Sequence, residues 1–76
     1  MSKPALVERI GAWALTRWEY DGAPLEAEHD DGFALSVDKD GDLNVDDLPD
    51  YRRHFHVPVA VIERLIADAR ARGVLK

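Results

Sequence analysis

Closely spaced aspartates in the middle of the chain are the residues best suited to chemistry. Four of them recur at short intervals, at Asp38, Asp40, Asp42 and Asp46. Carboxylate oxygens are the ligands that calcium prefers, and this alternating spacing resembles that of a calcium-binding loop. However, Leu43 stands where D-x-D-x-D-G repeats need glycine, and Pro49 stands where an EF-hand needs glutamate. The sequence therefore predicts no metal site in this segment.

The same stretch also fits a β-hairpin. A three-residue loop at residues 39–41 pairs the flanking strands in one register. In that register the apolar residues meet on one face, Val37 opposite Leu43 and Leu35 opposite Val45. A two-residue loop would shift the pairing by one residue and set apolar against polar side chains. The hairpin is therefore the preferred interpretation, with its aspartates in the turn.

The rest of the chain offers little for metal or catalytic chemistry. His54 and His56 would share one face of an extended segment, but zinc sites usually need three or four ligands and the spacing fixes no third. There is no cysteine, and the chain contains no nucleophile motif, glycine-rich phosphate loop or HExxH. A chain of 76 residues also leaves little room for a buried pocket. We therefore predict a non-enzymatic protein without a cofactor or a metal.

Helical spacing of apolar residues predicts a helix at the N-terminus. The stripe consists of Leu6, Val7, Ile10, Trp13, Ala14 and Trp18. Ser2 is the candidate N-cap of this helix. A rival interpretation breaks the helix near Gly11 and makes residues 14–20 a strand, with Trp18 and Tyr20 on one face.

A second helix is predicted at the C-terminus. It begins after Pro58 and ends at Gly73. Its apolar stripe consists of Val59, Ile62, Leu65, Ile66 and Ala69. Because this stripe is wider than one small sheet needs, it also allows a homodimer formed through the helix.

Three strand-like runs lie between the predicted helices, at residues 24–29, 33–37 and 43–45. Turn residues separate them, which predicts an antiparallel meander with one wet face. The residues expected on the inward face are Leu25, Ala27, His29, Phe33, Leu35, Val37, Leu43 and Val45. Residues 49–55 fit either a short helix or a fourth strand. The predicted fold is a single α+β domain over residues 1–76, with an N-terminal helix, a three-stranded antiparallel meander and a C-terminal helix packed on one face of the sheet.

The net charge of −5 conceals two parts of opposite sign. Residues 1–49 contain four basic and twelve acidic groups, whereas residues 50–76 contain six basic and three acidic groups. A dense acidic surface repels nucleic acid and attracts a basic partner. We therefore expect the meander to bind a larger protein with a basic surface through Glu26, Glu28, Asp30, Asp31, Asp40, Asp42, Asp46 and Asp47. The alternative is that the acidic excess serves only solubility.

In its small size, its acidity and its lack of cysteine, the chain resembles the inhibitors that phages and mobile elements encode, such as anti-CRISPR and anti-restriction proteins. The resemblance implies a small inhibitor of a nucleic-acid-binding machine, in which carboxylates take the place of DNA phosphates. It concerns size and charge, and no motif carries it, so it assigns no role to any residue.

The basic C-terminal part suggests an alternative function, that of a small DNA-binding regulator. Residues 50–73 fit a degenerate helix-turn-helix, and residues 57–75 resemble the recognition helix and G-[LV]-L ending of winged-helix repressors. The arginines available for DNA contact are Arg52, Arg53, Arg64 and Arg70. The start of the second helix would offer the major groove only Val59, Ala60 and Glu63, which lack the side chains that read bases. Binding of nucleic acid is therefore the less favoured prediction.

Two features of the sequence concern location. Glu8 and Arg9 interrupt the first apolar run, which argues against a signal peptide. The sequence contains no stretch of about 18 apolar residues, so no membrane span is expected. Together with the lack of cysteine, these features predict a cytoplasmic protein that does not bind membranes.

Overall fold

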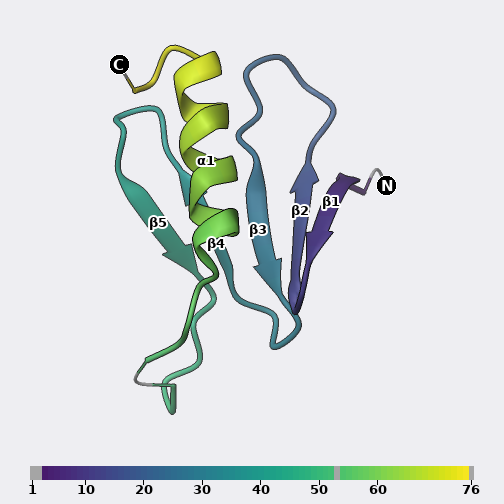
Figure 1. Ribbon diagram of the computed structural model, residues 1–76, viewed down its shortest axis with the longest axis vertical. Helices are drawn as coiled ribbons and strands as arrows, with labels where there is room; N and C mark the ends of the chain where they lie inside the picture. The colour runs from purple at the N-terminus through teal and green to yellow at the C-terminus, as the bar shows by residue number, and fades with distance from the viewer. Residues whose placement is uncertain (1–2, 53, 76) are drawn as a thin grey trace.

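Within residues 3–52 and 54–75, which the computed structural model describes, five antiparallel strands form one sheet and one helix packs on one of its faces (Figure 1). The strands follow chain order across the sheet as β1 (Ala5–Ile10), β2 (Trp13–Arg17), β3 (Glu26–His29), β4 (Ala34–Val37) and β5 (Leu43–Asp46). The helix α1 (Val59–Ala71) lies over β3 and β4. The chain is thus a small α+β domain built of β-hairpins, but the predicted N-terminal helix and the three-stranded sheet are wrong.

A β-hairpin takes the place of the predicted N-terminal helix. β1 and β2 pair antiparallel, and Ile10 pairs with Trp13 across a two-residue turn. Gly11 has φ 58°, and it alone in this turn has a positive φ. Glycine adopts this left-handed conformation without strain, and the first position of a type II′ turn requires it. The rival interpretation is therefore right about the break near Gly11 and the strand after it, but residues before Gly11 form β1 rather than a helix, and β2 ends at Arg17 rather than Tyr20.

Pairing within the sheet explains why the helical spacing misled. Trp13 and Leu15 alternate in β2 and are buried beneath α1. Leu6 and Val7, which a helix would have buried on the same stripe, are 61% and 57% exposed. Tertiary pairing thus overrides a local pattern that fits both periods. The proposed N-cap, Ser2, lies outside the described residues.

The predicted register of the central hairpin is confirmed in β4 and β5. The paired residues are Leu35 with Val45 and Val37 with Leu43. The Asp38 N–H donates to the Asp42 carbonyl at 2.9 Å, and the Gly41 N–H donates to the Asp38 carbonyl at 3.1 Å. Gly41 has φ 85°. The loop is therefore the expected three-residue loop with a left-handed glycine.

The carboxylate of Asp38 holds this turn together. It accepts hydrogen bonds from the N–H groups of Asp40 (2.9 Å) and Asp42 (3.0 Å) and from the side-chain amide of Asn44 (3.2 Å). The bond from Asp42, supported by the others, keeps the pKa of the Asp38 carboxyl below its usual 3.8. The residue that would begin a calcium loop thus serves as the side-chain acceptor of an Asx-turn.

Replacing Gly41 by alanine is expected to lower the free energy of unfolding by about 2 kcal/mol, because φ 85° is strained for any residue with a Cβ. The new Cβ would also lie 3.2 Å from Cδ2 of Leu75. Gly22→Ala is the matched control, since Gly22 has φ 79° but its Cβ would meet nothing within 4 Å. Urea unfolding measures both. Gly41→Ala should cost more than Gly22→Ala, and an equal cost would show that the Leu75 contact contributes nothing.

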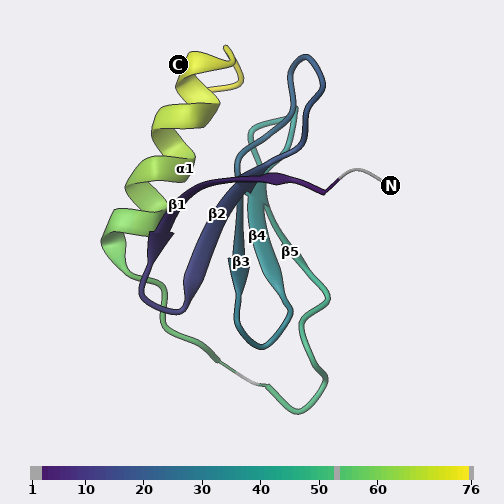
Figure 2. The ribbon, with the colours of Figure 1, turned by 90° about the vertical axis from the view of Figure 1, so that its right-hand side faces the viewer.

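The hydrophobic core lies between α1 and the middle of the sheet, and α1 stands on one side of the sheet only (Figure 2). The buried residues are Trp13, Leu15, Leu25, Ala27, Phe33, Leu35, Val37, Val61, Leu65 and Ala69. Leu43 and Val45, predicted to point inward, are 54% and 41% exposed. They lie on the α1 side of the sheet, as predicted, but they are not buried, because α1 lies over β3 and β4 and leaves β5 at the side of the helix (Figure 1).

The segment between β5 and α1 is an extended loop. Its described residues, 47–52 and 54–58, contain neither the predicted short helix nor the predicted fourth strand. Phe55 packs against Phe33 with ring centroids 4.9 Å apart, and the Arg52 guanidinium lies 5.1 Å from the Phe33 centroid. Arg52 also forms an ion pair with Asp31. These contacts attach the loop to the turn between β3 and β4.

Across the described ranges, no helix combines the length and the apolar character that crossing a membrane requires.

Candidate protein-interaction surface

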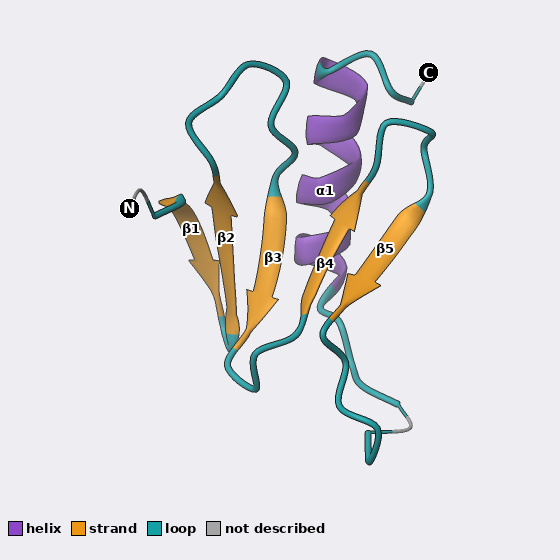
Figure 3. Cartoon of the chain, turned by 180° about the vertical axis from the view of Figure 1, so that it is seen from behind, coloured by secondary structure: helices purple, strands orange, loops and turns teal. Residues whose placement is uncertain are grey.

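No helix lies on the sheet face that points away from α1 within the described part of the chain, although Thr16 and Ser36 on this face are only 9% and 7% exposed (Figure 3). We call it the open face, and its central residues are Ala14, Thr16, Glu26, Glu28, Ala34, Ser36, Asn44 and Asp46. The pairing register arranges them in two rows across the sheet. One row is Thr16–Glu26–Ser36–Asn44, and the other is Ala14–Glu28–Ala34–Asp46. The open face therefore carries acidic side chains on β3 and β5, with small side chains on β2 and β4.

Glu26, Glu28 and Asp46 are the acidic residues that the structure brings together. Glu28 and Asp46 flank Ala34, so their Cα atoms are about 10 Å apart across two strand spacings. Among the described residues, none of the three carboxylates has an ion-pair partner. Glu26 accepts one hydrogen bond, from Nε1 of Trp18 at 3.2 Å. Their negative charge is thus not neutralised within the described chain.

The other predicted docking residues lie at the two ends of the sheet. Asp30 and Asp31 are in the turn after β3, where Asp30 pairs with Arg9 at 3.7 Å and Asp31 pairs with Arg52. At the opposite end, the turn between β4 and β5 contains Asp40 and Asp42. Asp47 follows β5 with a positive φ of 62°. The structure therefore does not gather all eight carboxylates, and it uses Asp31 internally to hold the loop before α1.

Three exposed apolar residues border the open face and were missed as site residues. Leu6 pairs with Thr16, which places it on the same face as Glu26. Trp18 and Tyr20 follow at the end of β2 and are 36% and 62% exposed. The core contains the aromatic residues Trp13 and Phe33 but not these two. The rival strand interpretation set Trp18 and Tyr20 on one strand face, but β2 ends at Arg17, before both of them.

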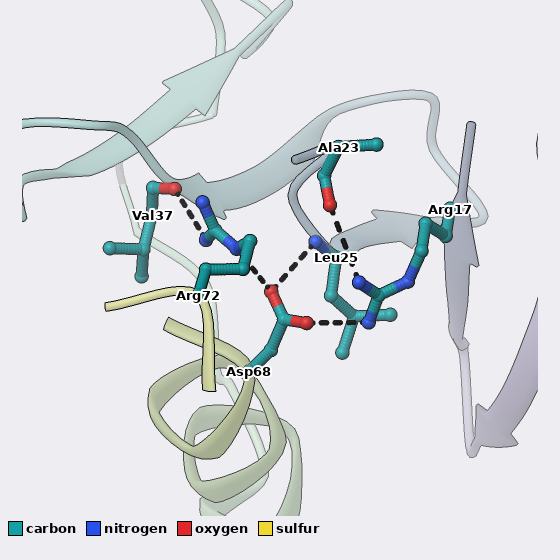
Figure 4. Close-up of polar contacts among 6 residues, drawn as sticks. All are labelled: Arg17, Ala23, Leu25, Val37, Asp68 and Arg72. Atoms are coloured by element: carbon teal, nitrogen blue, oxygen red, sulfur yellow. Dashed lines mark hydrogen bonds and ion pairs between the residues drawn. The ribbon is translucent and has the colours of Figure 1, made fainter. Parts of the chain in front are cut away.

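The strongest internal polar site surrounds Asp68 in α1 (Figure 4). Its side chain is 7% exposed. Oδ1 accepts from Nη2 of Arg17 at 2.5 Å, and Oδ2 accepts from the Leu25 N–H at 3.0 Å and from Nε of Arg72 at 2.8 Å. Burial raises the pKa of Asp68, but these hydrogen bonds outweigh burial and bring the pKa below its usual 3.8.

The same network fastens the helix to the sheet. Arg17 donates from Nη1 to the Ala23 carbonyl at 3.3 Å, and Arg72 donates from Nη2 to the Val37 carbonyl at 3.0 Å (Figure 4). Asp68 thus connects α1 to β2, to the loop before β3 and to the end of β4. Because both carboxylate oxygens already accept hydrogen bonds from the protein, Asp68 is a structural residue and not a general base.

The proposed helix-turn-helix does not form in the described residues, since the segment before α1 is a loop. Arg52 pairs with Asp31, and Arg64 pairs with Glu8 at 3.0 Å. Arg70 is exposed near the C-terminal end of α1. Arg53 lies outside the described residues. The three described arginines thus belong to separate parts of the surface and do not form one basic patch.

One recess of about 280 Å³ lies on the outer flank of α1, and it is lined by Ala60, Glu63, Arg64 and Ala67. All four residues are exposed, and its charged pair belongs to one helix surface. Within the described chain, no group of three or more histidine, aspartate and glutamate side chains is arranged to hold a metal ion. The recess therefore does not present the converging polar groups of a catalytic pocket.

Comparisons with protein-family models, with curated proteins and with solved structures find no match to this chain.

Proposed function

We propose that this protein is a non-enzymatic binding module that docks the open face of its sheet on a basic surface of a larger protein. The observation that supports it most is the placement of Glu26, Glu28 and Asp46 on the face that α1 leaves uncovered. Carboxylates without internal partners keep their charge for an incoming basic surface. At ordinary salt they attract such a surface over a distance of about 10 Å.

The apolar border of the open face supports a protein partner rather than a small cation. Aromatic side chains are enriched at protein interfaces, where they supply buried contact area. Trp18 donates to Glu26, so an aromatic anchor stands directly beside a charged one. Leu6 and Tyr20 extend the apolar area, and both are more than half exposed.

An inhibitor is one form that this function would take. Basic protein surfaces commonly bind the phosphates of nucleic acids. A carboxylate-bearing face that occupies such a surface excludes the nucleic acid from it. The similarity in size and charge to phage-encoded inhibitors agrees with this form of the proposal.

The test reverses the three charges in the variant Glu26→Lys/Glu28→Lys/Asp46→Lys. Immobilised wild-type protein captures the partner from an extract of the native host, and calorimetry then measures the affinity of the purified partner for both proteins. We expect the variant to bind about 100-fold more weakly, because like charges would face each other across the interface. Wild-type binding should also weaken as salt is raised. The variant should remain folded, since these carboxylates form no ion pair within the described residues.

The matched control is Asp21→Lys/Asp50→Lys/Glu63→Lys, which changes the net charge equally at exposed positions outside the open face. We expect its affinity to stay within a few-fold of wild type. An equal loss in both variants would attribute binding to net charge alone and contradict the proposal. Retardation of duplex DNA by the wild-type protein at low salt would favour the DNA-binding alternative.

A further inference from the structure

The outer side of β5 carries backbone groups that are free to pair. β5 is an edge of the sheet, and no strand lies beyond it in the described chain. The hydrogen bond from the Asp38 N–H to the Asp42 carbonyl identifies that pair as a hydrogen-bonded one. Hydrogen-bonded and non-hydrogen-bonded pairs alternate along an antiparallel ladder. Leu43 and Val45 therefore belong to non-hydrogen-bonded pairs, and their N–H and C=O groups point away from β4.

Apolar side chains stand at the same edge. Leu43 and Val45 share the α1 side of the sheet with their partners Val37 and Leu35, which are core residues. The partners are 6% and 1% exposed, whereas Leu43 and Val45 are 54% and 41% exposed. An added strand would place its own side chains beside Leu43 and Val45 on this face.

The flank of α1 on the side away from the N-terminal hairpin also carries apolar residues. Arg64 and Asp68 pair with residues of β1 and β2, so they define the flank that faces the N-terminal hairpin. At 3.6 residues per turn, Val59, Ile62 and Ile66 form a stripe on the opposite flank. Val59 is 70% exposed, and the two isoleucines are half-buried. We call Leu43, Val45, Val59, Ile62 and Ile66 the apolar strip.

Negative charge surrounds the β5 edge. Asp40 and Asp42 stand at one end of β5, and Asp46 and Asp47 stand at the other. Lys39 is the only basic residue of the sequence between Arg17 and Arg52. A strand that pairs with this edge would therefore be favoured by basic residues and disfavoured by acidic ones.

A second copy of the chain fits this edge poorly. The symmetric register that pairs the most outward groups of two β5 strands sets Leu43 opposite Val45 of the other copy. In that antiparallel register, Asp42 lies opposite Asp46 of the other copy. Like charges placed directly opposite each other destabilise a strand pair. The charge pattern thus disfavours self-association and leaves the edge to a partner of opposite charge.

We infer that the β5 edge binds an extended, basic segment of the partner by strand addition. The segment alternates apolar residues, which cover the apolar strip, with lysine or arginine residues, which point to the open-face side near Asp42 and Asp46. Strand addition draws affinity from main-chain hydrogen bonds and specificity from alternate side chains. This inference rests on the proposed function for the basic character of the partner.

The probe is an acetylated, amidated hexapeptide of alternating lysine and valine, added at millimolar concentration to the isotope-labelled protein. Hydrogen exchange measured by NMR should slow by about 10-fold or more at the amides of Leu43 and Val45, because these groups become hydrogen-bonded. A peptide of alternating glutamate and valine should give no protection. In the variant Val45→Pro, the N–H removed makes no bond to β4, so the sheet should persist while the protection at Leu43 is lost.

A second variant, Leu43→Lys, keeps every N–H but places a cation in the apolar strip. It should lower the affinity for the lysine peptide by about 10-fold.

Peptide binding that survives both variants, or no binding of the lysine peptide at all, would overturn the inference. Protection of Leu43 and Val45 without peptide, accompanied by a dimer in sedimentation, would overturn it in favour of self-pairing. If the peptide changes the NMR chemical shifts of Glu26 and Glu28 alone, this would overturn strand addition while supporting the open face as the binding surface. A further result would separate the two proposals. If the peptide protects Leu43 and Val45 but the Glu26→Lys/Glu28→Lys/Asp46→Lys variant binds the captured partner as tightly as wild type, strand addition at the β5 edge would be supported and docking through the open face would be contradicted.

Discussion

Replacing Trp13 by alanine is expected to lower the free energy of unfolding by about 4 kcal/mol, the usual cost of removing a buried tryptophan. Trp13 is 2% exposed. Its ring meets those of His29 and Phe33 edge-on, with centroids 4.9 and 5.6 Å apart. Such aromatic pairs contribute about 1 kcal/mol beyond the area that they bury. The substitution thus removes the largest side chain of the core.

A domain of 76 residues has little stability in reserve. At the usual range per residue, its free energy of unfolding is about 4–11 kcal/mol, so Trp13→Ala removes a third of it or more. Thermal unfolding followed by circular dichroism should show a fall in Tm of about 15 °C or more. Trp18→Ala is the matched control, because Trp18 is 36% exposed. It should cost about 1 kcal/mol or less, and equal losses at the two tryptophans would contradict the assignment of Trp13 alone to the core.

Asp68→Ala is expected to cost about 3 kcal/mol, because it leaves the guanidinium groups of Arg17 and Arg72 without their carboxylate. Arg72 has a side-chain exposure of 13%, so water replaces the lost partner poorly there. Arg17 is 40% exposed and is expected to contribute the smaller part. Urea unfolding measures the loss. Glu63→Ala, an exposed carboxylate in the same helix, should leave stability nearly unchanged, and a comparable loss there would contradict a specific role for Asp68.

The contribution of Asp68 should also depend on pH. Its pKa in the folded protein lies below the unfolded value of 3.8, so the ionised carboxylate stabilises the fold. That stability is fully present above about pH 5 and is lost as pH falls through the folded pKa. Asp68→Asn removes this component, so its free energy of unfolding should change less than that of wild type between about pH 5 and pH 3. Identical pH profiles would show that Asp68 does not contribute to acid unfolding.

The central hairpin and the C-terminal helix could be predicted because several local signals agree there. In the hairpin, the Asp40-Gly41 turn and the alternation of Leu35, Val37, Leu43 and Val45 permit one register, which β4 and β5 adopt. In the helix, the apolar stripe lies between a proline and a glycine, and α1 covers Val59–Ala71. Local chemistry was sufficient for the existence of both elements, but the buried face of the helix differs from the predicted stripe, because Val61 is buried and Val59 is 70% exposed.

The N-terminal segment could not be settled in this way, because its apolar residues fit two periods. Ile10, Trp13 and Leu15 suit either a helical stripe or the strands of a hairpin. The difference lies in the left-handed φ of Gly11 and in the pairing of β2 with β3. Strand pairing is a property of the whole sheet, and the spacing within one segment does not contain it.

Only part of the candidate surface could be predicted from the sequence. Alternation along β3 correctly set Glu26 and Glu28 on the other face of the sheet from Ala27, which is fully buried. The ion pairs of Arg9 and Arg52 with the aspartates in the turn after β3 could not be predicted from local spacing. Local spacing also concealed the role of Asp68, whose partners Leu25 and Arg17 are 43 and 51 residues away. Contacts between segments this distant depend on the finished fold.

The sequential order of the strands has a consequence for how the chain folds during synthesis. Each strand pairs only with its neighbours in sequence. The sheet can therefore form one hairpin at a time, and closing each short loop costs little conformational entropy. Within the described residues, the side of the sheet that carries Leu15, Phe33 and Leu35 packs against α1, which is synthesised after all five described strands. Until then the nascent sheet exposes its apolar side. A stalled chain that ends before residue 59 should therefore bind hydrophobic dyes and chaperones, whereas the released protein should not.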